Sequence, residues 1–214
     1  MSTSRLKIYN AALRMLGERK LASLTENREP RRVLDEVWDD DFTDYCLEQG
    51  LWNFAMRSIE LTYSPSITPA FGYTRAFDKQ ADWIRTGVVS LDEFFNCPLL
   101  QYADEGEYWR ANHDTLYIKY VSNDSSYGGD LSLWPASFIR YVEAELASQS
   151  CERITKSDSK QVDLERKAKK YLAEAKNKDA MNQPTQFLPT GSWVNSRMGN
   201  GGGNRGRNRS SLLG

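Results

Sequence analysis

Apolar positions recur at helical spacing near the start of the chain, most clearly between Pro30 and Met56. The residues of this pattern are Val33, Leu34, Val37, Trp38, Phe42, Tyr45 and Cys46. Steps of three and four residues place them on one face of a helix. Pro30 suits a first helical turn, and Gly50 suits a left-handed stop. The pattern predicts a helix over residues 30–49, followed by an apolar exit that contains Trp52 and Phe54.

Three further helices follow from the same kind of spacing. One apolar stripe predicts a helix over residues 4–16, and another predicts a helix from Pro135 to about Arg153. A last helix begins after a cap at Ser157 or Asp158 and carries apolar residues on one side and lysines on the other. The chain therefore contains four predicted helices.

Between the second and third helices the spacing changes to that of strands. Leu116 to Val121 is the clearest strand because β-branched and aromatic residues dominate it. Asn112-His113-Asp114 suits a hairpin turn before it. Shorter strand-like segments are bounded by turn residues: Ser58–Tyr63, Trp83–Arg85, Val88–Val89 and Tyr102–Arg110. Residues 58–130 are predicted to form a small, mostly antiparallel β insertion.

Together these elements predict an α+β fold that is mainly a helical bundle of about four helices. A small antiparallel β insertion lies between helices two and three, and an extended C-terminal tail follows the bundle. Residues 1–57 and 131–181 form the bundle core in this prediction.

Residues 182–214 form a flexible Gly/Arg-rich arm in the same prediction. They contain seven glycines and four arginines but no acidic residue, so they bury too little apolar surface to fold alone. The arm still holds scattered anchors for a binding partner. The apolar ones are Phe187, Leu188, Trp193, Leu212 and Leu213, and the basic ones are Arg197, Arg205, Arg207 and Arg209.

Composition and motifs give no support for an enzyme, a cofactor or a metal centre. Three cysteines lie far apart with no C-x-x-C pair, which argues for free thiols in a reducing compartment. The one histidine, His113, lies in a predicted turn. The G-x-G-x-x-G match at Gly201 follows no strand and opens no helix, so it is compositional. The net charge of −1 gives no general case for nucleic acid.

An acidic run lies in the second predicted helix. Consecutive helical carboxylates diverge by about 100°, so Asp39, Asp40 and Asp44 are interpreted as a solvated face rather than a metal site. Asp41 differs, because on a straight helix it falls within the apolar stripe. Either it forms a salt bridge with an arginine, within the chain or from a neighbouring subunit, or this part of the helix lies at a solvent edge.

Two stretches carry a family resemblance, namely YNAALRMLGERKLASLTE and, after the helix, GLWNFAMRSIEL. The pattern, strongest over residues 5–62, resembles the tail tubular protein A family of short-tailed phages. The resemblance implies a structural head-to-tail adaptor, with about twelve copies in a ring between the portal protein and the tail nozzle protein. Genomic DNA would pass through the central channel. The expected location is the virion neck, assembled in the host cytoplasm, with no membrane association.

A ring requires two different patches on each subunit. The expected pair is the acidic face of helix two with the lysine-rich face of helix four, namely Asp39, Asp40, Asp41, Asp44, Lys167, Lys169 and Lys170. The C-terminal arm is expected to dock on the portal. An alternative is a nucleic-acid-binding module, because arginines in glycine-rich coil contact phosphates and stack on bases.

Overall fold

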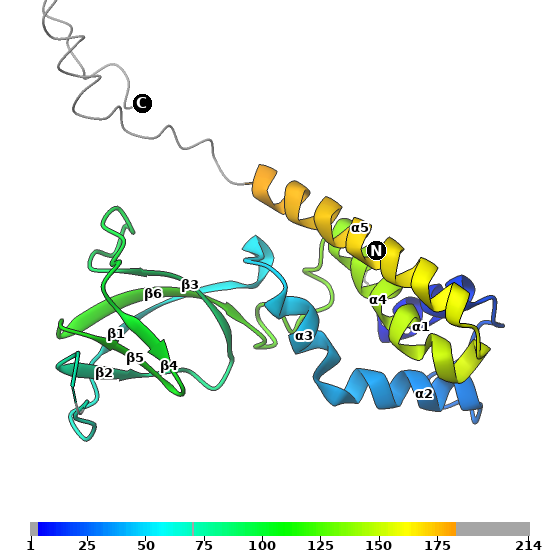
Figure 1. The fold of residues 1–214 in the computed structure, drawn as a ribbon, viewed down its shortest axis with the longest axis horizontal. Helices are drawn as coiled ribbons and strands as arrows, with labels where there is room; N and C mark the ends of the chain where they lie inside the picture. The colour runs from blue at the N-terminus through cyan, green and yellow to red at the C-terminus, as the bar shows by residue number, and fades with distance from the viewer. Residues whose placement is uncertain (1–3, 70, 183–214) are drawn as a thin grey trace, which may run out of the picture. The chain divides into compact units, whose positions relative to one another are not determined.

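The computed structural model of the chain describes residues 4–69 and 71–182. Residues Met1–Asn182 form one compact unit. Within this unit the helices gather around α4, and the strands lie in two three-stranded antiparallel sheets (Figure 1).

The first helix, α1 (Arg5–Leu16), lies where its apolar stripe predicts. Gly17 ends it with a φ of +78°, a conformation that glycine adopts without steric cost. The N–H groups of Gly17 and Glu18 donate to the carbonyls of Arg14 and Leu13. This cap satisfies carbonyls that a helix end leaves without partners.

The central helix is α4 (Ala136–Thr155), which packs against α1, α2 (Glu29–Val37) and α5 (Asp158–Met181). Its buried residues are mostly small in its second half, namely Ala144, Ala147, Ser148, Ser150 and Cys151. Small side chains let neighbouring helices approach closely. The sequence predicted one apolar face for this helix, and its small residues gave no sign that several helices cover it.

The strands form two sheets, and the strands of the first sheet are longer than those of the second. β1 (Met56–Thr62), β6 (Thr115–Ser122) and β3 (Trp83–Ser90) form the first sheet, with β6 in the centre. β2 (Arg75–Asp78), β5 (Tyr108–Ala111) and β4 (Ala103–Glu105) form the second, with β5 in the centre. The strand predicted over residues 116–121 is therefore the central strand of the larger sheet.

The predicted hairpin turn at residues 112–114 is wrong. β5 and β6 belong to different sheets, so the chain crosses from one sheet to the other at this point. Two side chains tie the crossing to the region where β2 begins. Asn112 Oδ1 accepts a bond of 2.9 Å from the N–H of Thr74, and Asp114 Oδ1 accepts one of 2.9 Å from Arg75 Nε.

The prediction of a mainly helical bundle with one small insertion is also wrong. The described chain is 44% helix and 20% strand, an α+β mixture in which the strands build two sheets and a second apolar core. Irregular pairing explains why the sequence showed β3 only as two short segments, Trp83–Arg85 and Val88–Val89. Its register against β6 shifts between Trp83 and Arg85 and between Thr86 and Val88. Each shift breaks the alternation by which a strand is recognised.

The two sheets are joined by a polar cluster around Thr86 of β3. The Thr86 hydroxyl accepts hydrogen bonds from the indole N–H groups of Trp83 at 3.0 Å and Trp109 at 2.8 Å. It donates to Asp104 Oδ2 of β4 at 2.5 Å, and Lys79 pairs with the same carboxylate. Thr86 is half-buried, and its hydroxyl uses its donor and both acceptor positions.

The apolar exit after Gly50 leads from the helices to β1, and Trp52 is its buried anchor. The ring of Trp52 is 1% exposed and lies edge-to-face against Phe138 of α4, with centroids 4.8 Å apart. Its indole N–H donates to the Leu47 carbonyl at 3.0 Å. The apolar exit therefore packs against α4, where Phe54 also contacts Phe138.

Candidate functional site

The acidic run forms an elbow rather than part of a straight helix. α2 ends at Val37, a π turn covers Trp38–Phe42, and α3 (Thr43–Glu48) follows. Asp40 has φ −93° and ψ 57°, and Asp41 has φ 51° and ψ 24°, so neither is helical. The predicted uninterrupted helix over residues 30–49 is therefore wrong, and we refer to residues 38–42 as the elbow.

The elbow places Asp41 at a solvent edge of this chain. Its side chain is exposed, and it forms no ion pair with any residue in the described part of the chain. The prediction that placed it in the apolar stripe assumed a constant turn of 100° per residue. The left-handed conformation at Asp41 breaks that rotation, and the carboxylate lies in solvent.

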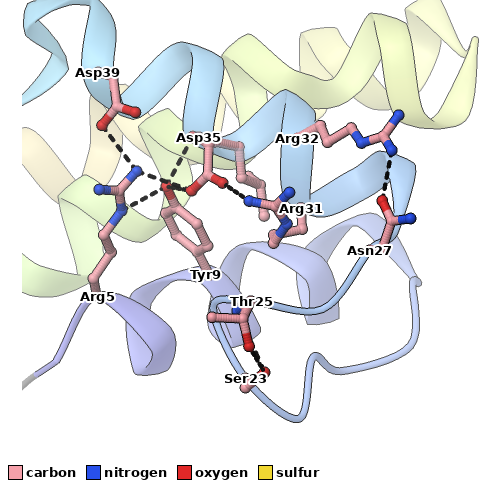
Figure 2. A network of polar contacts seen from close by, with 10 residues as sticks. Arg5, Tyr9, Ser23, Thr25, Asn27, Arg31, Arg32, Asp35 and Asp39 are labelled. Atoms are coloured by element: carbon pink, nitrogen blue, oxygen red, sulfur yellow. Dashed lines mark hydrogen bonds and ion pairs between the residues drawn. The ribbon is translucent and has the colours of Figure 1, made fainter.

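Asp39 is held at the start of the elbow by Arg5 of α1 (Figure 2). Arg5 Nη2 donates to Asp39 Oδ1 and to Asp35 Oδ1, each at 2.9 Å, and its Nε donates to the Tyr9 hydroxyl at 2.8 Å. Arg31 pairs with the other oxygen of Asp35. Asp39 therefore belongs to a network that fastens α2 to α1.

The Tyr9 hydroxyl lies inside this network. It is 2.9 Å from Asp35 Oδ1 and 3.1 Å from the Leu34 carbonyl, so its proton has an acceptor on α2. Burial raises the pKa of this hydroxyl, and the hydrogen bond to Asp35 raises it further. Tyr9 therefore stays neutral and acts as a fixed donor near the elbow.

Replacing Arg5 by alanine is expected to lower the free energy of unfolding by about 1–2 kcal/mol, because Asp35 and Tyr9 then lose a charged partner. Urea denaturation measures this change. The matched control is Arg32→Ala, since Arg32 is more exposed and pairs only locally with Asn27 and Glu29. A change of less than about 0.5 kcal/mol is expected there. Equal effects for the two variants would contradict a stabilising role of the network.

Asp44 is half-buried, so its assignment to a solvated face is wrong. Its Oδ2 accepts a hydrogen bond of 2.9 Å from Asn123 Nδ2, which lies just after β6. Burial raises the pKa of Asp44, although the bond from Asn123 acts in the opposite direction. Of the four aspartates, only Asp40 and Asp41 remain exposed with no ion pair among the residues described.

The basic partner of this surface was expected on α5. Lys167, Lys169 and Lys170 are all exposed, and within residues 4–69 and 71–182 none of them forms an ion pair. Lys160, at the start of the same helix, is different. It donates to the Leu16 carbonyl at 2.5 Å and so ties α5 to the end of α1. The lysine-rich side of α5 is thus available for contact with a partner.

The expected portal-docking arm lies outside the described residues. Its anchors are Phe187, Leu188, Trp193, Arg197, Arg205, Arg207, Arg209, Leu212 and Leu213. The arm therefore remains a prediction from the sequence.

No metal-binding group of three or more histidine, cysteine or acidic side chains occurs within the described part of the chain. No helix described is long and apolar enough to cross a membrane. The cysteines Cys46, Cys97 and Cys151 are free thiols. Burial raises the pKa of the Cys46 thiol, which disfavours its reactive thiolate form.

Sequence reasoning missed two features on the described surface. One is the loop after β3, where Phe94 is 73% exposed. The other is a cavity of about 420 Å³ between the end of α5 and the start of α4. The loop had a visible signal, since the run Leu91-Asp92-Glu93-Phe94-Phe95 places two aromatic residues between turns.

No family model matches the chain, and no curated protein matches it.

Proposed function

We propose that the protein is a structural head-to-tail adaptor of a short-tailed phage, which forms a ring around a channel for DNA. The observation that carries this proposal is the resemblance over residues 5–62. In the structure this stretch comprises α1, α2, the elbow, α3 and β1. Its motif residues Tyr9, Leu34 and Trp52 are buried. The motif is therefore a packing pattern, and it supports a shared fold rather than a shared chemistry.

The charged surfaces also support assembly into a ring. Closed cyclic symmetry requires each subunit to present two different patches, one to each neighbour. Asp40 and Asp41 at the elbow are exposed acids, and the lysines of α5 are exposed bases on a separate element. Opposite charges on separate patches favour head-to-tail contacts and disfavour contacts between identical patches.

In this proposal the ring binds the portal protein on one side and the tail nozzle protein on the other, with about twelve copies as the resemblance implies. The test is to mix the purified full chain with portals and image the particles by electron microscopy. We expect closed rings on portals, and a bound mass that gives the copy number. Chains that never bind portals at any ratio would contradict the adaptor function.

Reversing the charge of Lys167, Lys169 and Lys170 to glutamate is expected to weaken ring formation, because three repulsive contacts then face the acidic elbow of the neighbour. Occupancy on portals, measured at low and high salt, reports the effect. The control is Arg19→Glu with Lys20→Glu, an exposed basic pair on another segment. Adding Asp40→Lys and Asp41→Lys to the triple variant is expected to restore occupancy. Wild-type occupancy of the triple variant would exclude this pairing.

A further inference from the structure

The loop between β3 and β4 is held in a fixed conformation by its own side chains. We call residues 91–97 the finger. Asp92 accepts hydrogen bonds from the N–H groups of Asn96 at 2.9 Å and Cys97 at 2.8 Å, and Ser90 Oγ donates to it at 2.6 Å. The Ser90 hydrogen bond is the main reason that the pKa of Asp92 is lowered. The carboxylate is thus ionised and organises the turn.

This fixed loop displays an aromatic side chain to solvent. Phe94 is 73% exposed, whereas the ring of Phe95 lies 4.1 Å from Lys119 Nζ of β6. The backbone of Phe95 is left-handed, with a φ of 58°, which is rare for a bulky residue. An exposed aromatic on a preorganised loop loses little conformational entropy on binding, which is characteristic of interface anchors. The finger therefore presents Phe94 as an exposed aromatic on an ordered loop.

The chain contains a cavity of suitable size and lining. It has a volume of about 420 Å³ and lies where α5 ends (orange in Figure 1) and α4 begins. We call it the socket. Trp52, Phe138 and Ala175 lie buried beneath its floor, Met181 is its exposed apolar residue, and its polar lining includes Lys178 and Asp179. Cavities of this size accept an aromatic side chain with its neighbours.

The charges around the socket match those of the finger. Glu93, next to Phe94, has no hydrogen bond or ion pair among the described residues, and neither has Lys178 at the socket. Ala136 and Ser137 of the first turn of α4 also line the socket, and no side chain caps this helix. The positive end of a helix favours a carboxylate. Asp179 also lines the socket, but it is buried and its Oδ2 accepts bonds from Asn53 at 3.0 and 3.1 Å, so Lys178 is the exposed charge there.

We propose that the finger of one copy of this chain inserts Phe94 into the socket of a second copy, with Glu93 facing Lys178. This inference deepens the proposed ring and rests on it for the head-to-tail arrangement of the copies. The contact joins two different patches, so it can repeat around a closed ring.

Disulfide trapping between two full-length variants tests the contact. Both variants carry Cys97→Ser, because Cys97 is an exposed thiol within the finger. One variant then carries Asn96→Cys, at an exposed finger residue that leaves Phe94 in place, and the other carries Met181→Cys, at a socket residue that is 82% exposed. Upon mixing under mild oxidation we expect a linked heterodimer at about tenfold the yield of either variant alone.

Two controls use residues of similar exposure elsewhere. Phe71→Cys replaces Asn96→Cys, since Phe71 is 87% exposed on a different loop without acidic neighbours. Val162→Cys replaces Met181→Cys on the opposite end of α5. We expect neither control pair to link above background. Equal yields for all pairs would overturn the proposal.

A charge exchange provides a second test that needs no cysteine. Glu93→Lys or Lys178→Glu alone is expected to reduce the self-association constant of the full chain by about tenfold. Sedimentation-velocity ultracentrifugation measures this constant. The double variant, with Glu93→Lys and Lys178→Glu in the same chain, again places opposite charges at the contact between copies. It is expected to recover the wild-type association constant. A double variant as weak as the two single ones would contradict the pairing.

The outcomes separate this contact from the proposed function. Rings on portals without the link between residues 96 and 181 would leave the adaptor function standing and reject the finger contact. A specific link in solution, with no binding to portals, would support the contact and reject the adaptor function.

Discussion

Replacing Trp52 by alanine is expected to lower the free energy of unfolding by about 3–5 kcal/mol. The indole is buried against Phe138, and its removal leaves a void that the surrounding helices fill only in part. The hydrogen bond from its Nε1 to the Leu47 carbonyl is lost as well. Because this residue lies between the helices and β1, both parts of the unit depend on it.

Urea denaturation followed by far-UV circular dichroism measures this loss. Trp52→Phe keeps an aromatic ring but removes the indole N–H, so a smaller loss of about 1–2 kcal/mol is expected. The control is Leu51→Ala, since the neighbouring Leu51 is largely exposed. It is expected to change the stability by less than about 0.5 kcal/mol. An unchanged denaturation midpoint for Trp52→Ala would show that the apolar exit does not anchor the core.

A chain that ends at Gln183 is expected to keep its fold and to lose portal binding by at least about 100-fold. Both apolar cores are built from residues before 183, so the truncation removes none of the buried residues described. The removed segment holds the predicted anchors, among them Phe187 and Trp193. Several copies on one symmetric partner add avidity, so the loss of one anchor per copy has a multiplied effect.

Portal binding is compared with circular dichroism of the same samples, so that loss of fold and loss of binding are distinguished. Full-length Trp193→Ala tests the apolar anchor alone. Full-length replacement of the four arginines by lysine keeps the charge and removes the bidentate geometry that arginine offers to carboxylates. If the shortened chain attaches to portals as well as the intact one, the arm hypothesis is wrong. If the truncation instead abolishes binding to DNA and leaves portal binding unchanged, the nucleic-acid alternative is favoured.

The elements with strong local signals were predictable. α1 follows from one apolar stripe and a glycine stop, and both signals act within a few residues of the chain. β6 follows from a dense run of β-branched and aromatic residues. The exposed lysines of α5 follow from the same periodicity, because one side of this helix is apolar and the other is charged.

The candidate interface was predictable only in part. Periodicity treats a helix as straight, so it could not reveal that Asp41 leaves the stripe at the elbow. It also could not reveal that Arg5 engages Asp39 or that Asn123 engages Asp44, since these partners lie 34 and 79 residues away in the chain. The exposure of Phe94 was equally hidden, because apolar character alone does not tell whether another segment covers a side chain.

The sequence by itself determined where most helices and the strongest strands lie, because periodicity and turn residues act over a few positions. Only the tertiary structure decided that β5 and β6 enter different sheets, that α4 is the central helix, and that no other described segment covers the finger or the socket. Each of these depends on contacts between segments far apart in the chain. Local spacing records which face of an element is apolar, whereas the element that covers this face is chosen by the packing of the whole chain.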